Sequence, residues 1–296
     1  MLYHINNKNL LFKIMDYSIS LYIPVFNAEK TIGMVIDGVK KQSLSPNEII
    51  VVNDASTDRT VNIVSDYKDI KLITLTEEKG IAYSRNIAIS NCKNDFIASL
   101  DHDVLPDKDW LKNMMDSMIK NKSSYCGGKM IEKYIKNSFN SWRAKRYKQN
   151  WGDNDLINPP FVFGCNTLQL KNTWEKIGGY EEKYITNGED VNYSKKIRSQ
   201  NLITNYSVKA LTHHLQNDNL TSLSNRVWRY HTYSYKIEKP SYIRFFRLVI
   251  KQFKFLIGRF LNDLIKLKFN FLIIDLIVFI QFIRLELQRT RKEKNK

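Results

Sequence analysis

Short apolar runs alternate with amphipathic stretches along the first third of the chain, from residue 18 to residue 103. The apolar runs predict four buried strands, at residues 19–25, 48–52, 70–75 and 95–100. The stretches between them repeat apolar residues every three or four positions, which predicts helices at 29–41, at 81–90 and around 61–64, the last with an N-cap at Ser56 or Thr57. Strands that alternate with helices predict an α/β fold with a mostly parallel, doubly wound sheet.

Polar side chains follow three of these predicted strands. Asn27 comes after the first strand, Asn53-Asp54 after the second, and Asp101-His102-Asp103 after the fourth. Open parallel sheets bind their ligands at the carboxyl ends of the strands. The sequence therefore predicts a binding site at that edge of the sheet.

The pattern is less regular in the middle of the chain. We expect a strand at 161–170, a short helix at 172–177 and a helix at 189–198, and a strand-like run ends at His213-His214. Together these patterns predict three parts: an N-terminal extension (1–17), an α/β domain (18–225) and a tail (226–296).

The tail has a different pattern, in which aliphatic and aromatic residues mix with Arg and Lys. Four basic residues recur at steps of three and four: Arg244, Arg247, Lys251 and Lys254. Five apolar residues take the opposite side of the same helix: Phe245, Val249, Phe253, Leu256 and Phe260. A basic amphipathic helix is typical of binding to a membrane surface. A second apolar run, 271–283, is shorter than the roughly 20 residues of a spanning helix and contains Asp275 and Gln281, so we expect it at an interface or packed on protein.

Charge sharpens this picture. The chain has 296 residues and a net charge of +16, and the tail alone carries 17 Lys and Arg against five Asp and Glu. A basic tail suggests an anionic partner, either nucleic acid or lipid. The aliphatic stripe beside the basic residues favours an anionic membrane surface and argues against nucleic acid. Three scattered cysteines and no apolar signal segment within residues 1–12 predict a cytoplasmic location.

The polar residues at the strand ends suggest chemistry. Asp101 and Asp103, one residue apart, could hold a hard divalent cation such as Mg²⁺ or Mn²⁺. Asp54 could accept a hydrogen bond from a ring N–H of a base. Glu189 and Asp190 open a predicted helix, where a carboxylate could act as a general base.

Taken in order, these motifs resemble a known family. They are Ile23-Pro24-Val25-Phe26-Asn27, the run 51–58 (VVNDASTD), Arg85-Asn86, Leu100-Asp101-His102-Asp103, Gly164-Cys165-Asn166, Gly178-Gly179-Tyr180 and Gly188-Glu189-Asp190. Their order and spacing resemble the signature of family-2 glycosyltransferases of the GT-A fold. The resemblance covers residues 18 to about 215.

The resemblance implies an inverting transferase that uses a nucleotide-diphospho-sugar donor and a divalent metal, Mn²⁺ or Mg²⁺. The implied donor-binding residues are Pro24, Phe26, Asn27, Asp54, Arg85 and Asp101. The implied metal ligands are Asp101, Asp103 and, as a further ligand, His214. Asp190 would be the catalytic base that deprotonates the acceptor, with Glu189 as the next candidate. The acceptor would be a carbohydrate or a lipid-linked molecule, as in surface-polysaccharide, lipopolysaccharide or glycolipid assembly on the inner face of the cell membrane.

Two features depart from the family pattern. Asn53-Asp54 stands where the family more often has two acidic residues, which leaves the base preference open. The Gln-x-x-Arg-Trp motif of processive synthases is absent from the sequence, so we expect transfer of one sugar per encounter. A non-catalytic nucleotide-sugar-binding or scaffold protein of the same fold is the alternative from another class. A nucleotidyltransferase is disfavoured because no glycine-rich loop follows the first strand.

Overall fold

The structure, a computed structural model, describes residues 17–233 and 239–294. Most of the predicted N-terminal extension lies outside these residues. The chain divides into two compact units. We call them the sheet unit (up to residue 131, 149–185 and 189–215) and the helical unit (132–148, 186–188 and 216 onward).

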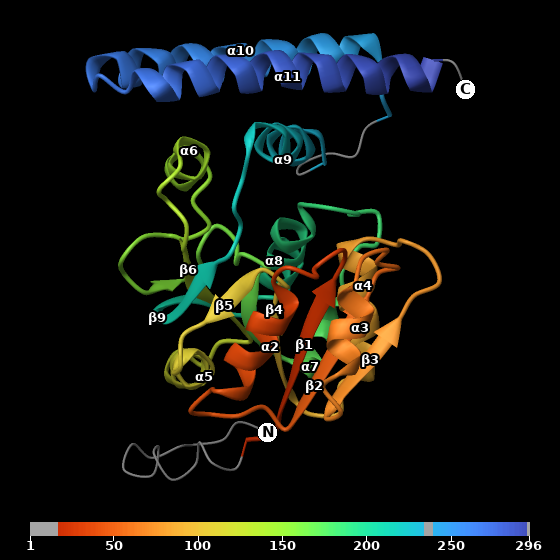
Figure 1. The fold of residues 1–296 in the computed structure, drawn as a ribbon. Helices are drawn as coiled ribbons and strands as arrows, with labels where there is room; N and C mark the ends of the chain where they lie inside the picture. The colour runs from red at the N-terminus through yellow and green to blue at the C-terminus, as the bar shows by residue number, and fades with distance from the viewer. Residues whose placement is uncertain (1–16, 234–238, 295–296) are drawn as a thin grey trace. The chain divides into compact units, whose positions relative to one another are not determined.

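A mixed sheet forms the centre of the sheet unit (Figure 1). Within the described residues its strands follow the order β3-β2-β1-β4-β8-β6-β9-β5, with β7 paired to β9. The parallel part comprises β1 (Ile19–Val25), β2 (Glu48–Asn53), β3 (Ile70–Thr74) and β4 (Phe96–Leu100). The antiparallel part comprises β5 (Val104–Pro106), β6 (Tyr125–Glu132), β7 (Leu156–Ile157), β8 (Asn166–Leu170) and β9 (Thr204–His214).

Helices cover the sheet because each of its faces is apolar. Alternate residues of the fully buried β1 enter different cores: Leu21 and Ile23 belong to one cluster and Tyr22 to the other, as the period of two in a strand requires. The helices of this unit are α2 (Ile32–Lys40), α3 (Thr60–Ser65), α4 (Ile81–Asn91), α5 (Trp110–Asn121), α7 (Lys171–Ile177) and α8 (Glu189–Ser199). The predicted α/β fold is confirmed.

Two local predictions were wrong. The helix predicted around 61–64 begins at Thr60 instead of following a cap at Ser56 or Thr57. Ser56 instead accepts a hydrogen bond from the Asn27 amide, and Asp58 accepts one from the Thr60 amide (3.0 Å). The predicted strand at 161–170 begins only at Asn166, because the preceding residues bond to side chains instead of to a neighbouring strand.

The helical unit contains α6 (Ser138–Arg146), α9 (Leu220–Tyr233), α10 (Tyr242–Ile265) and α11 (Phe269–Lys294). Its apolar core is small and consists of Trp142, Leu223, Val227, Ile274 and Val278. None of the helices in the described residues has the length and apolar character that crossing a bilayer requires.

The predicted faces of the tail helix were wrong. Arg244 is buried and pairs with Glu286 of α11, whereas Phe253 is 50% exposed. The spacing of apolar and basic residues predicted the helix correctly. Which side of the helix faces inward depends on a buried acidic partner on another segment, Glu286.

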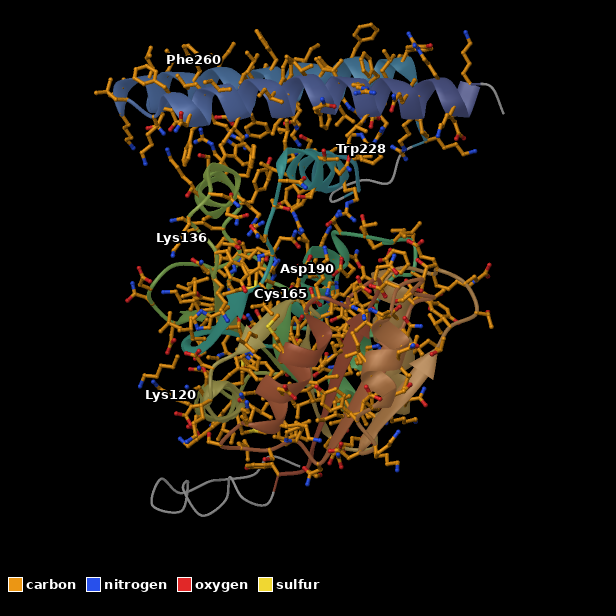
Figure 2. All side chains as sticks on the ribbon, viewed as in Figure 1. Lys120, Lys136, Cys165, Asp190, Trp228 and Phe260 are labelled. Atoms are coloured by element: carbon orange, nitrogen blue, oxygen red, sulfur yellow. The ribbon has the colours of Figure 1, made fainter. Side chains whose placement is uncertain are left out.

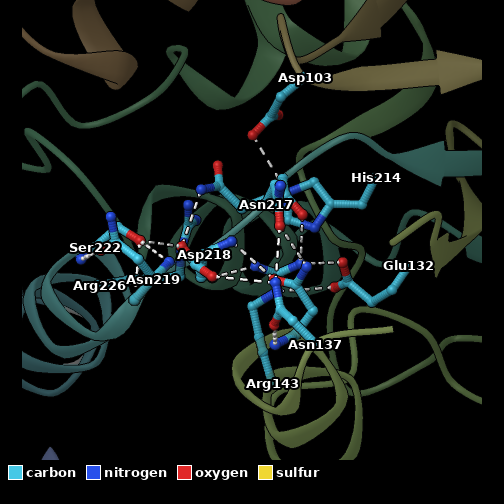
Figure 3. A network of polar contacts seen from close by, with 12 residues as sticks. Asp103, Glu132, Asn137, Arg143, His214, Asn217, Asp218, Asn219, Ser222 and Arg226 are labelled. Atoms are coloured by element: carbon cyan, nitrogen blue, oxygen red, sulfur yellow. Dashed lines mark hydrogen bonds and ion pairs between the residues drawn. The ribbon is translucent and has the colours of Figure 1, made fainter. Parts of the chain in front are cut away.

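A buried cation in the helical unit, Arg143, contacts two segments at which the chain enters this unit. Arg143, on α6, is 2% exposed and pairs with Glu132 and Asp218, and its Nη2 donates to the carbonyl of Gln216 at 2.9 Å (Figure 3). Glu132 and Gln216 are two of the three residues at which the chain enters this unit. Arg143 therefore holds two chain crossings together.

We predict that Arg143→Met lowers the free energy of unfolding by about 3–5 kcal/mol, because it leaves buried carboxylates without their main partner. Urea-induced unfolding followed by circular dichroism measures this change. The control is Lys112→Met, which breaks an exposed pair with Asp116 and should cost less than about 1 kcal/mol. Equal effects of the two substitutions would contradict the structural role of Arg143.

Candidate functional site

The polar residues predicted from the sequence do gather at one edge of the sheet. Strands β2, β1 and β4 are parallel neighbours, so the residues that follow their carboxyl ends lie side by side. The segment before β8 and the first turn of α8 complete this edge. In Figure 2 Asp190 and Cys165 are labelled there.

Arg85 lies at the centre of this edge. It projects from α4 and is 1% exposed. Its Nη2 donates to Asp101 Oδ1 at 2.8 Å, and its Nη1 donates to the Gly164 carbonyl at 2.8 Å and to Ser99 Oγ at 3.1 Å. Its Nε lies 3.7 Å from Glu189 Oε1. One guanidinium thus joins the end of β4, the segment before β8 and the start of α8.

The ionisation of Arg85 follows from these contacts. Burial alone would lower the pKa of the guanidinium, but the charge of Asp101 and the nearby Tyr22, Tyr180 and Glu189 raise it well above its usual value. The group stays positively charged and needs all of its acceptors. Arg85, predicted to bind the donor, therefore uses both of its Nη atoms on protein acceptors, while its buried Nε makes no hydrogen bond within the described residues.

Asp190 lies on the other side of Gly164 from Arg85. Its Oδ2 accepts from the Gly164 amide at 3.1 Å, and its Oδ1 accepts from the Val191 amide at 2.7 Å. A Cβ on Gly164 would lie 3.2 Å from both Arg85 Nη2 and Asp190 Cβ, which explains why glycine fits here. Gly164 consequently links the two charged groups, because its carbonyl accepts from Arg85 and its amide donates to Asp190.

The two carboxyl groups at the start of α8 differ. Glu189 is 6% exposed, and burial, together with the charge of Asp190, raises its pKa to about 8. Burial also raises the pKa of Asp190, opposed by the amides of Gly164 and Val191, and this residue is only partly buried. Burial and the neighbouring charge thus favour the protonated form of Glu189, and Asp190 is the more accessible of the two side chains.

Asp103 contacts His214 at the end of β9, and Asp101 bonds to Arg85 instead. The pairing of β5 with β9 brings Asp103 Oδ2 within 3.2 Å of His214 Nε2, and Figure 3 shows this contact. Burial raises the pKa of Asp101, although the Arg85 charge opposes this shift. The sequence prediction placed these three residues together, and the structure does bring Asp103 and His214 into contact.

The side-chain oxygen and nitrogen atoms of Asp103 and His214 suit a divalent cation that also binds a ligand. Among the described residues no group of three or more His, Cys, Asp and Glu side chains is arranged to hold a metal ion alone. Mg²⁺ is commonly held by one or two carboxylates together with substrate phosphates, and Mn²⁺ accepts both oxygen and imidazole ligands. The carboxylate of Asp103 and the imidazole of His214 fit this kind of incomplete site.

The predicted nucleoside-side residues surround the ends of β1 and β2. Pro24 is buried in β1, and Phe26 is 39% exposed. Asn27, with φ 51°, accepts from the Thr57 amide at 2.8 Å and so fastens the loop after β2.

Asp54 is engaged with the backbone. Its two oxygens accept from the amides of Lys79 (2.7 Å) and Gly80 (2.8 Å), just before α4. Gly80 has φ 90°, and a Cβ there would lie 2.6 Å from the Ile185 carbonyl oxygen, so the turn requires glycine. In this structure Asp54 positions the start of α4, and any contact with a base would use its remaining lone pairs.

Sequence reasoning assigned no role to several residues that build the site. Ser99 and the Gly164 peptide bind Arg85, and the ring of Tyr180, which stacks on Tyr193, lies 5.9 Å from the Arg85 guanidinium carbon. Gly164 and Tyr180 belong to the motifs named above. Their roles depend on contacts between segments far apart in the chain, which no local pattern carries.

The amino-acid sequence is similar to those of known proteins. A family model described as glycosyl transferase family 2 matches residues 20–178. The glucosyltransferase WfgD of Escherichia coli, named as acting from UDP-Glc on α-D-GlcNAc-diphosphoundecaprenol, is 37% identical over 115 residues, which are 38% of this chain and 46% of that protein. The O-antigen chain rhamnosyltransferase RfbN of Salmonella typhimurium is 26% identical over 214 residues, 67% of each chain. The chain thus spans about half to two thirds of the length of these relatives.

Solved structures share the fold. The S. aureus TarS fragment 1–349 in complex with UDP has a TM-score of 0.56 at 18% identity, with coverage of 74% of this chain and 67% of that one. The mannosyltransferase PcManGT of Pyrobaculum calidifontis, in complex with GDP-Man and Mn²⁺, has a TM-score of 0.57 at 19% identity, with coverage of 74% and 63%. Since the family model covers more than half of the chain, this protein belongs to glycosyl transferase family 2.

Proposed function

We propose that this protein is an inverting glycosyltransferase that moves a sugar from a nucleotide-diphospho-sugar to an acceptor hydroxyl. The observation that carries the proposal is the continuous series of hydrogen bonds from Asp101 through Arg85 and Gly164 to Asp190. These hydrogen bonds link Asp101, the proposed donor-side carboxylate, to Asp190, the proposed base. The complexes of related folds with UDP, UDP-GlcNAc and GDP-Man support a nucleotide-sugar donor.

In the proposed reaction Asp190 removes the proton of the acceptor hydroxyl as its oxygen attacks the anomeric carbon. Attack from the side opposite the leaving nucleoside diphosphate inverts the configuration at that carbon. The raised pKa of Asp190 suits a general base, because a stronger base takes the proton more readily. Glu189, whose protonated form is favoured, would leave Asp190 as the ionised member of the pair.

We assign Asp103 and His214, with Asp101 beside them, as the residues that would hold a divalent metal, Mn²⁺ or Mg²⁺. When bound, such a metal neutralises charge on the diphosphate leaving group. The Mn²⁺ in the PcManGT complex supports this assignment. On the nucleoside side we retain Pro24, Phe26, Asn27 and Asp54 as the proposed lining.

The acceptor and location follow from the relatives and the tail. WfgD is named for a lipid-linked acceptor and RfbN for an O-antigen chain. We therefore propose a carbohydrate or lipid-linked acceptor in surface-polysaccharide assembly, and a peripheral position on the cytoplasmic face of the cell membrane. A non-catalytic nucleotide-sugar-binding protein would need no ionisable base, so the perturbed Glu189–Asp190 pair favours the enzyme.

We predict that Asp190→Asn lowers sugar transfer by ~10²-fold or more while donor binding is kept, because base catalysis contributes that much. Transfer is measured as nucleotide release in the presence of acceptor, and donor binding by calorimetry. Asp69→Asn, an exposed carboxylate paired with Lys40, is the matched control and should change neither. Transfer at the normal rate by a folded Asp190→Asn protein would mean that another group is the base.

A second prediction concerns pH. The pKa of Glu189 is raised in the folded protein from 4.5 to about 8, so the folded state holds this proton more tightly than the unfolded chain does. Its stabilising contribution is complete below pH 4.5 and is lost progressively as the pH rises through about 8. Glu189→Gln stays neutral, so its melting temperature should fall less than that of the wild type between pH 5 and 8. An identical decline in both proteins would show that Glu189 is ionised throughout.

A further inference from the structure

Helices α10 and α11 form a two-helix hairpin in the helical unit, and they lie side by side in Figure 1. Three acidic residues of this hairpin face inward and are fully or nearly fully buried. Asp263 pairs with Lys145 and Arg146, and Asp275 pairs with Arg146 at 2.6 Å. Glu286 pairs with Arg244 and accepts from Trp228 Nε1 at 3.0 Å.

These buried pairs fix how the helices are rotated. A buried carboxylate without its cation is strongly destabilising, so neither helix can turn its acidic side toward solvent. The apolar side chains of Ile274, Val278 and Phe282 point the same way, into the unit. The opposite side of the hairpin is therefore held outward.

That outward side is apolar over most of its length. On α10 the exposed apolar residues recur at steps of three and four: Ile243, Phe246, Ile250, Phe253, Ile257, Phe260 and Leu264. On α11 they are Phe269, Ile273, Leu276 and Ile280. Their exposed fractions run from 42% to 84%, and Phe260 is labelled on the hairpin in Figure 2. We call this set the outer hairpin face. Soluble monomers rarely leave so continuous an apolar row in water.

The charges on the exposed surface of the hairpin all have one sign up to Lys292. The basic residues are Arg247, Lys251, Lys254, Lys266, Lys268, Arg284 and Arg291. Every acidic residue between Tyr242 and Lys292 is buried in an ion pair. The acids are used inside the unit, and the outside combines apolar and cationic groups without anions.

We propose that the outer hairpin face lies in the plane of an anionic lipid bilayer and embeds its apolar row at the headgroup boundary. A lipid surface satisfies both components, because acyl chains cover the apolar row and anionic headgroups attract the basic residues. A second copy of the chain would bring like charges together, which disfavours a homodimer through this face. The inference rests on the proposed membrane association and is independent of the donor and of the catalytic base.

The test measures binding of the full-length protein to vesicles of phosphatidylglycerol and phosphatidylcholine by flotation. We expect binding that weakens as salt rises, since the attraction of surface charges is screened. The triple variant Phe246→Ser, Ile250→Ser and Phe253→Ser should lose at least 10-fold in affinity. Each of Lys251→Gln and Lys254→Gln should lose about five-fold, which corresponds to ~1 kcal/mol.

The matched control is Ile157→Ser, an equally exposed apolar residue of the sheet unit, which should bind as the wild type does. Hydrolysis of nucleotide sugars is measured on the same samples. Unchanged vesicle binding by the triple variant would overturn the proposal, and so would a stable dimer in sedimentation that this variant dissociates. Vesicle binding without any donor hydrolysis would contradict the proposed enzyme activity but would still support the proposed membrane-binding face.

Discussion

The buried guanidinium of Arg85 is the constraint on which the site depends. A cation with 1% exposure must find acceptors within the protein, and it finds them on the end of β4, on the Gly164 carbonyl and beside Glu189. The segment before β8 consequently departs from strand geometry, which leaves the Gly164 amide to bind Asp190. Asp101, the proposed donor-side carboxylate, therefore bonds to Arg85 directly, and Asp190, the proposed base, is linked to it through Gly164.

In the helical unit the buried charges are carboxylates, and they require cationic partners just as the buried Arg85 requires acceptors. Asp218, Asp263, Asp275 and Glu286 are buried among arginine and lysine side chains, so this small unit is organised by ion pairs as much as by its short list of core residues. Three of the five acidic residues of the tail, Asp263, Asp275 and Glu286, are buried in this way. Between Tyr242 and Lys292 the exposed charges are therefore all basic, because the acidic residues of this range are buried in ion pairs.

Local patterns in the sequence predicted the parallel half of the sheet well. The run 19–25 is buried at every position, and the bounds of β1 are those expected. The carboxylates after β4 could be found because they follow directly on an apolar strand. The N-cap expected at Ser56 or Thr57 was wrong because both residues bond across to Asn27, a contact between two loops.

The pairing of the antiparallel strands, the contact between Asp103 and His214 and the orientation of the tail helix could not be predicted from local patterns, because they depend on contacts between distant segments. Strands β5, β6 and β7 are short or pair with distant partners, and the contact between Asp103 and His214 spans 111 residues. The orientation of the tail helix depends on Glu286 and Asp263, which are buried and pair with cations. Both residues lie outside the range 244–260 from which the helix faces were predicted. Arg85 was named as a donor contact, and its burial favours a positioning role instead.

The most direct measurement of the central claim is ¹H NMR of the protein with a panel of nucleotide-diphospho-sugars, Mg²⁺ and acceptor. Our account predicts release of a nucleoside diphosphate that stops when the metal is chelated, and a product whose anomeric configuration is opposite to that of the donor. A product with the donor's configuration, or a folded protein that consumes none of the sugars, would contradict it.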